Sequence, residues 1–151
     1  AIVPDLLFQP HSAVMGIEFP EEQAQLPEKY RNGIFAALKG SWNRTQPTGY
    51  KVVFVPFEDG MPTGTYENFA TGFWVENDQR AEVWGRPVDV EFAPDGAIFI
   101  ADDTGKTIWR VTYDAPEEGD GSESVDVPVD QPALEGSADD TGTEDDTGTN
   151  D

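Results

Sequence analysis

The sequence predicts an all-β fold: about two blades of a β-propeller over 1–114, followed by a disordered acidic tail over 115–151. Three observations lead to this prediction. Short strand-like runs alternate with tight turns, the pattern of one unit recurs in a second, and helical periodicity is nearly absent. Only 21–30 has the composition of a short helix.

The clearest unit is the stretch 84–113, WGRPVDVEFAPDGAIFIADDTGKTIWRVTY. Its predicted strands are 87–92, 97–101 and 107–113, joined by turns at 93–96 and 102–106. The first strand is apolar at alternate positions, and the second is a continuous apolar run, as expected of a strand buried on both faces. In the turn at 93–96, Pro94 presets φ, Asp95 bonds its own backbone and Gly96 accepts a positive φ.

A first unit, at about 11–74, repeats this pattern with longer turns. Its predicted strands are 12–19, 34–38, 50–57 and an outer strand at 66–74, with an insertion loop at 20–27 and a polar connection at 75–83. The alignment pairs 33–37 with 97–101, Phe19 with Phe92, and Leu38-Lys39 with Asp102-Asp103. The first unit therefore has four strands and the last unit three. Because a blade buries its faces against its neighbours, we expect this piece alone to expose apolar faces and to be marginally stable or to aggregate.

Composition separates the tail from the rest. The 151-residue chain has 30 Asp and Glu against nine Lys and Arg, for a net charge of −21. The stretch 115–151 holds 13 of these acidic residues, with no basic and no aromatic residue, and such a segment cannot bury enough apolar surface to offset its chain entropy. The acidity argues against a nucleic-acid partner, and it fits either a protein adapted to brine or an ordinary acidic secreted domain.

Two absences in the sequence bound the chemistry and the location. There is no cysteine, so we expect neither a disulfide framework nor thiolate chemistry. There is also no apolar run of about 18 residues, so we expect no membrane span. The chain begins at Ala1 rather than Met, inside sequence that looks ordered, which suggests a fragment or a processed piece.

Beyond its strand pattern, the chain resembles the C-terminal part of the glucose/sorbosone dehydrogenase family. The matching stretches are HSAVMGIEF (11–19), YRNGIFAALKGSWNR (30–44), GYKVVFVPFEDG (49–60), ATGFW (70–74) and the whole of 84–113. The combination of GSWNR, GYKVV and WGRPVDV is specific, and it is most similar to the sorbosone dehydrogenase branch. Lys39 departs from that branch, which usually has His there, and instead resembles the aldose dehydrogenase branch.

This resemblance implies a six-bladed propeller enzyme that uses pyrroloquinoline quinone (PQQ). PQQ is a planar tricarboxylate with an ortho-quinone, so Arg and Lys suit its carboxylates, and a nearby cation stabilises charge that develops on the quinone oxygens. The residues that the resemblance places at the cofactor are Arg86, Lys39, His11 and Arg44. It assigns no catalytic residue here, because the family's proton-accepting His lies in an earlier blade.

Structural roles for the same residues stay open. Arg86 can be an exposed turn residue bonded to Asp102 or Asp103, and Lys39 a solvated loop residue. Arg44 can pack on Trp42 or pair with acids. Trp42 and Trp84 can line the pocket or belong to an aromatic core.

The implied function is part of a quinoprotein sugar dehydrogenase that contributes cofactor contacts and pocket wall and is inactive alone. Its implied partners are a sugar, the missing blades and an unidentified electron acceptor, and the implied location is extracellular or periplasmic. The resemblance also implies calcium, with ligands outside this chain. Asp102-Asp103 lacks the spaced ligands of an EF-hand loop, which favours a turn role, and we assign no metal ligand.

Two other functions share the same strand pattern. A non-catalytic propeller that binds carbohydrate or protein is the main alternative, and convergence of Lys39, Arg86 and His11 on one channel would argue against it. A propeller hydrolase of the lactonase type needs an acid-lined metal site, for which the sequence offers no good candidate set.

Overall fold

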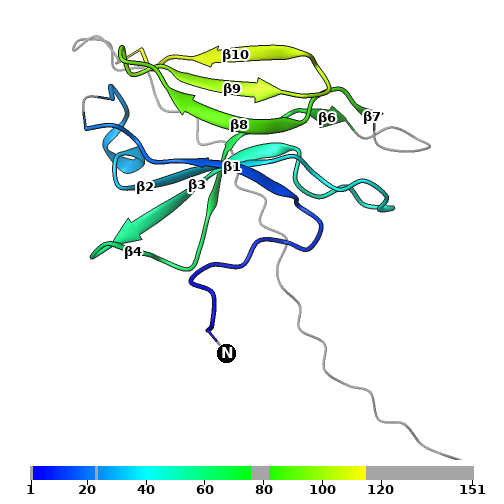
Figure 1. Cartoon of the computed structure of the whole chain (residues 1–151), viewed down its shortest axis with the longest axis horizontal. Coiled ribbons are helices and arrows are strands. Elements are labelled where there is room, and N and C mark those ends of the chain that lie inside the picture. The colour runs from blue at the N-terminus through cyan, green and yellow to red at the C-terminus, as the bar shows by residue number, and fades with distance from the viewer. Residues whose placement is uncertain (1, 23, 76–81, 115–151) are drawn as a thin grey trace, which may run out of the picture. The chain divides into compact units, whose positions relative to one another are not determined.

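A computed structural model describes residues 2–22, 24–75 and 82–114 (Figure 1). The tail predicted at 115–151 and the middle of the connection predicted at 75–83 lie outside the described residues. The regular elements in the described ranges are ten β-strands and one turn of 3-10 helix, η1 (Glu28–Tyr30), so the all-β prediction is confirmed. The short helix expected within 21–30 is present only as that single turn.

The larger sheet is antiparallel and contains five strands. They are β1 (Val14–Glu18), β2 (Gly33–Leu38), β3 (Lys51–Glu58), β4 (Met61–Pro62) and β5 (Glu67–Ala70). β2 lies between β1 and β3, and β3 also pairs with β4 and β5. The four strands predicted for the first unit are therefore confirmed, although the outer strand ends at Ala70 rather than Trp74.

The second sheet contains β8 (Pro87–Phe92), β9 (Ile98–Asp102) and β10 (Thr107–Val111) in the order β10-β9-β8. The predicted turn between β8 and β9 is confirmed. Gly96 has a φ of 82°, and its N–H donates to the carbonyl of Ala93 (2.8 Å). The N–H of Ala97 donates to the carboxylate of Asp95 (3.1 Å), which is the expected side-chain bond within the turn.

A short hairpin corrects the polar connection predicted at 75–83. β6 (Trp74–Val75) is antiparallel to β7 (Glu82–Val83). This hairpin could not be predicted, because each strand has only two residues and lacks a visible alternation.

The two units share register as well as strand order. Leu38 opposes Lys51 in the first unit, and Asp102 opposes Thr107 in the second. The first strand of each unit, β1 or β8, has a register shift at the same place. It lies between Val14 and Gly16 in β1 and between Pro87 and Asp89 in β8. The predicted alignment of the two units is therefore confirmed at the level of backbone pairing.

The main hydrophobic core lies between the two sheets, and Figure 1 shows β8 beside β1 and β2. Phe35 of β2 is fully buried in it, and its ring lies 5.4 Å from that of Phe92 and 5.1 Å from that of Phe54. The other buried members of this cluster are Ala24, Leu26, Ala37, Val52, Val90, Ile98 and Ile100. Alternate residues of β2, β8 and β9 thus hold the sheets together.

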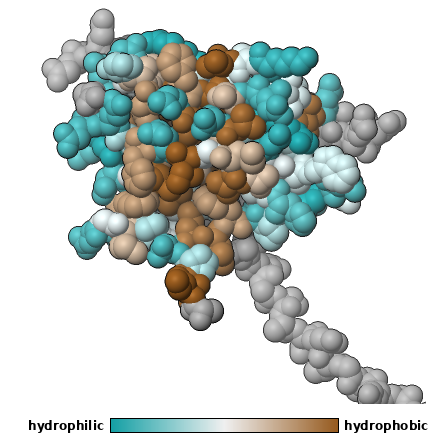
Figure 2. Space-filling model, viewed as in Figure 1, coloured by the Kyte–Doolittle hydropathy of each residue, from teal (hydrophilic) through white to brown (hydrophobic). Residues whose placement is uncertain are grey.

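The opposite faces of the two sheets are covered to different extents: Ala36, Leu38 and Val53 on the first sheet are fully buried under Phe8 and Tyr66, whereas the outer face of the second sheet is only partly covered. Phe99 and Ala101 on the outer face of β9 are half-buried, so the expectation of a strand buried on both faces was wrong. One face of β9 packs on the first sheet, and no second sheet covers the other within the described residues. Large apolar side chains are exposed on or next to β1 and on β10: Val14, Met15, Ile17, Phe19, Ile108 and Trp109. Figure 2 shows apolar residues gathered on the face in view. Exposed apolar faces were expected, whereas marginal stability and aggregation stay predictions.

At Gly16, the backbones of β1 and β8 come close together. A Cβ placed there would lie 2.9 Å from the Cα of Asp89 and 3.1 Å from the carbonyl oxygen of Val88, on β8. Real Cβ atoms essentially never come within 3.0 Å of such an atom, so any side chain at this position would push β1 and β8 apart.

We therefore predict that Gly16→Ala destabilises the fold by about 1–3 kcal/mol, the usual cost of overpacking a filled site. Denaturant unfolding followed by tryptophan fluorescence would measure this change. The control is Met15→Ala, which removes an exposed neighbouring side chain and should cost less than about 0.5 kcal/mol. Equal costs for the two variants would contradict the close approach.

Candidate anion-binding site

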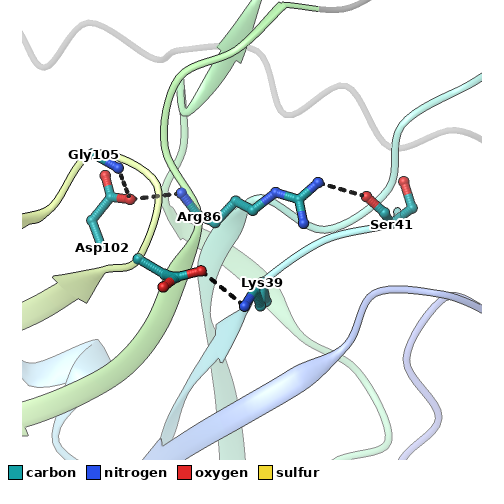
Figure 3. A network of polar contacts seen from close by, with 6 residues as sticks. Lys39, Ser41, Arg86, Asp102 and Gly105 are labelled. Carbon is teal, nitrogen blue, oxygen red and sulfur yellow. Dashed lines mark hydrogen bonds and ion pairs between the residues drawn. The ribbon is translucent and has the colours of Figure 1, made fainter. Parts of the chain in front are cut away.

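Two of the predicted cofactor residues meet at one end of the packed sheets. Lys39 directly follows β2, and Arg86 directly precedes β8. Figure 3 shows both side chains within one network of polar contacts that also contains Ser41, Asp102 and Gly105. The two cations come from different sheets, so the packing of those sheets brings them together.

The guanidinium of Arg86 is held by neutral groups. It is half-buried, and its Nη2 donates to the carbonyl of Ser41 (3.3 Å). Its Cζ lies 5.3 Å from the ring centroid of Tyr50, within cation–π range. Tyr50 is buried, and its hydroxyl also bonds to the Ser41 carbonyl. In the part of the chain that the structure describes, no carboxylate forms an ion pair with Arg86, so its charge is oriented without being neutralised.

The carboxylate of Asp102 fixes the backbone around Arg86. Its Oδ1 accepts the N–H groups of Arg86 (2.8 Å) and Gly105 (2.8 Å), and its Oδ2 accepts the indole N–H of Trp109 (3.3 Å). Asp102 is only 4% exposed. It therefore acts as a turn acid, as the sequence favoured, although the backbone that it holds includes Arg86 as well as its own turn.

Glycines make room for this buried carboxylate. A Cβ on Gly85 would lie 2.7 Å from Oδ2 of Asp102, and a Cβ on Gly105 would lie 2.5 Å from it. Any larger residue at either position would displace the carboxylate. The glycines of WGR and DDTG are thus the local sequence features that allow Asp102 to be buried.

Lys39 makes a different kind of contact. Its Nζ lies 2.9 Å from Oδ2 of Asp103, and the Lys39 and Asp103 side chains are 30% and 56% exposed, respectively. Lys39 and Asp103 occupy equivalent places in the two units. The N–H of Lys39 donates to the carbonyl of Ala13 (2.9 Å), and the N–H of Asp103 donates to that of Arg86 (3.1 Å). Equivalent positions thus carry opposite charges and pair across the two sheets.

His11 and Arg44 lie near the network without joining it. His11 is exposed, with a φ of 67°, and the neighbouring Ser12 accepts the N–H of Gly40 (2.8 Å) through its carbonyl. Arg44 is exposed and donates to the carbonyl of Pro10 (3.2 Å). No hydrogen bond or ion pair among the described residues links either side chain to Lys39 or Arg86. Their cofactor roles stay predictions.

The two tryptophans of the sequence prediction have different surroundings. Trp84 packs against Phe73 and Trp109, with ring centroids 5.6 and 6.0 Å away, so it belongs to an aromatic cluster. Trp42 follows Ser41 directly and is 88% exposed.

Sequence reasoning missed Ser41 and Tyr50 as partners of Arg86. No local pattern indicates a carbonyl acceptor such as that of Ser41, and Tyr50 was assigned only to the start of a strand. The motif pair GSW and GY, nine residues apart in the chain, was the available signal.

Hydrogen bonding outweighs burial at Asp102. Burial tends to raise the pKa of its carboxyl, but bonds from the N–H groups of Arg86 and Gly105 and from the Trp109 indole hold the pKa below its ordinary value. A carboxyl with a lowered folded pKa stabilises the fold above its unfolded pKa of about 3.9. That contribution is lost as the pH falls through the lower, folded value.

We predict that Asp102→Asn lowers the free energy of unfolding at pH 7 by about 1–3 kcal/mol, the scale of hydrogen bonds to a charged group. The gap between variant and wild type should begin to narrow below the unfolded pKa of about 3.9, because the carboxyl of the unfolded chain is protonated first, and it should narrow further as the pH falls through the lowered folded pKa. Denaturant titrations at pH 7, 5 and 3 measure this. The control is Asp59→Asn, an exposed turn residue at the other end of β3. A gap that is equal at pH 3 and pH 7 would contradict the charged hydrogen-bond network.

These features define a class of protein: an all-β domain whose packed antiparallel sheets hold an oriented arginine and a lysine at one end. Comparison with known proteins supplies the family. The chain belongs to the TrAA12-like family, whose model matches residues 1–114.

Relatives and solved structures agree with this assignment. The chain is 37% identical over 105 residues to an uncharacterized protein of Borreliella burgdorferi, and 28% identical over 127 residues to a pyrroloquinoline quinone-dependent pyranose dehydrogenase of Coprinopsis cinerea. These matches cover 69% and 74% of this chain, but only 27% and 16% of the relatives. The chain is therefore related to PQQ-dependent sugar oxidoreductases and spans a small part of their length.

Two structural matches have a TM-score of 0.54. One is the holo form of the PQQ domain of the Coprinopsis cinerea pyranose dehydrogenase, 28% identical, covering 72% of this chain and 28% of that one. The other is a family AA12 carbohydrate-active enzyme of Trichoderma reesei, 26% identical, covering 70% of this chain and 26% of that one. Across the residues that the structure describes, no helix is long and apolar enough to cross a membrane.

Proposed function

We propose that this chain is part of a PQQ-dependent sugar dehydrogenase and that it contributes cofactor contacts and pocket wall rather than the complete catalytic set. The observation that carries the proposal is Arg86, an oriented guanidinium with no carboxylate partner among the described residues, beside Lys39 in a chain related to PQQ-dependent enzymes.

The donors at this site fit an anionic, planar cofactor. Ser41 and Tyr50 fix the guanidinium of Arg86 while leaving further N–H groups for a carboxylate, which guanidinium binds with two parallel bonds. The ammonium group of Lys39 has three N–H donors, and one of them faces the exposed carboxylate of Asp103. Trp42, exposed next to Ser41, offers an aromatic surface to a planar ring.

When bound, PQQ would supply the quinone that accepts a hydride from the sugar. Lys39 and Arg86 would bind and orient it, and their charge would favour the negative charge that develops on its oxygens. His11 and Arg44 are proposed as outer contacts. Calcium is proposed from the family resemblance, with ligands from other parts of the protein.

We further propose that the two sheets are neighbouring blades of a six-bladed propeller. The strand order β1-β2-β3 with β5 outermost supports one complete blade, and β8-β9-β10 supports a blade with three strands. The half-buried outer face of β9 would then pack on another blade. The rest of the protein, an electron acceptor and a sugar are the proposed partners, in an extracellular or periplasmic location.

Sequence features that point to different branches of the family bear on the substrate class. GSWNR and WGRPVDV are similar to the sorbosone branch, whereas Lys39 resembles the aldose branch. A sugar aldehyde or an aldose is therefore the proposed substrate class. A non-catalytic propeller that binds carbohydrate or protein is the alternative, but it offers no reason to hold Arg86 oriented without an acidic partner.

The test is PQQ binding by the full-length protein, measured by fluorescence titration in the presence of calcium alongside dye-linked sugar oxidation. Arg86→Ala and Lys39→Ala should each weaken binding by roughly 1.5–3 kcal/mol, the scale of a charge-assisted hydrogen bond. Lys29→Ala removes an exposed cation from the other end of the first sheet, and it should leave the affinity unchanged. A folded protein that does not bind PQQ would contradict the proposal and favour the binding module.

A further inference from the structure

We propose that the adjacent acids Asp102 and Asp103 act in opposite senses on the anion site: Asp102 positions Arg86 for an anionic ligand, and Asp103 is the counter-ion that this ligand displaces from Lys39. This inference rests on the proposed function and names residues that control affinity there. The sequence favoured a turn role for these acids and left open a bond from either of them to Arg86.

The backbone of Arg86 is bonded on both sides by this pair. Its N–H donates to the Asp102 carboxylate (2.8 Å), and its carbonyl accepts the N–H of Asp103 (3.1 Å). Asp102 itself cannot shift, because Gly105 and Trp109 also donate to it and it is almost fully buried. The start of β8, and hence the base of the Arg86 side chain, is fixed by Asp102.

Asp102 achieves this without neutralising the guanidinium. Its carboxylate is committed to backbone and indole N–H groups, while the Arg86 side chain reaches away toward Ser41 (Figure 3). Loss of Asp102 would therefore release the backbone of Arg86 and disturb the orientation of its side chain, without removing an ion-pair partner of the guanidinium. Asp102 is a positioning residue in this proposal and does not touch the ligand.

Asp103 has the opposite relation to its cation. Its exposed carboxylate lies 2.9 Å from Nζ of Lys39, so a ligand carboxylate and Asp103 compete for the same ammonium. A partly exposed pair of this kind contributes little, equivalent to a factor of up to roughly five in an equilibrium constant. A ligand with several carboxylates can therefore displace it, at the cost of that factor and of repulsion by the remaining negative charge.

The test compares PQQ with its uncharged trimethyl ester as probes of the full-length protein. Asp103→Asn should tighten PQQ binding by roughly twofold to fivefold and leave ester binding unchanged, because only the carboxylates compete with Asp103. Asp59→Asn removes the same charge at the far end of β3 and should change neither affinity. A merely structural role for Asp103 would not tighten binding of one probe alone.

Asp102→Asn should weaken PQQ binding about tenfold in the folded protein, with little further loss in an Arg86→Ala background, as expected for residues that act as a unit. Trp109→Phe removes one of the bonds to Asp102 and keeps a ring, so it supplies a milder variant if Asp102→Asn does not fold. It should weaken binding about twofold to threefold, and no change in either variant would overturn the positioning role.

The outcomes separate the two proposals. PQQ binding by wild type with unchanged or weaker affinity in Asp103→Asn would overturn the counter-ion role alone. Equal losses from Asp102→Asn with and without Arg86 would overturn the positioning role alone. Absence of PQQ binding by folded wild-type protein would overturn the proposed function, and with it this inference.

Discussion

Face-to-face packing of the two antiparallel sheets is the constraint on which everything else in this chain depends. Each sheet has a strongly apolar face that it buries against the other sheet and cannot bury alone. Phe35 lies at the centre of the contact, with aromatic neighbours from its own sheet and from β8. The lack of a side chain at Gly16 allows β1 and β8 to come close together. Once this packing is set, the ends of β2 and β8 lie together, and with them Lys39 and Arg86.

The internal repeat explains how a binding site arises at this junction. The two units share strand order, register and the backbone bond that closes the second strand onto the first. Their differences are in side chains at equivalent places. Lys39 in one unit corresponds to Asp103 in the other, and Ala13 corresponds to Arg86. Equivalent backbone positions in the two units thus carry a cation and an anion that pair with each other, so the site arises from side-chain differences between the units.

Much of this fold could be predicted because its signals are local. The turn through Pro94, Asp95 and Gly96 and the alternation in β8 depend on neighbouring residues, and the repeat fixed the alignment of the units. The site was only partly predictable. Lys39 and Arg86 followed from a family resemblance, but contacts to Ser41 and Tyr50 depend on segments 36 to 45 residues away. The same holds for the half-burial of Phe99, which depends on what covers the sheet rather than on β9 itself.

The net negative charge of the chain opposes anion binding, so the arrangement of donors around Arg86 decides whether an anion can bind. With a net charge of −21, the long-range field repels any anion, so attraction has to come from donors in direct contact. Salt shortens the reach of that field to about 3 Å at 1 M, whereas hydrogen bonds from a half-buried guanidinium act within contact distance. An oriented Arg86 that no acid in the described ranges neutralises is therefore what an anion site in so acidic a chain requires. Lys39 is arranged differently, because its ammonium group already forms an ion pair with Asp103.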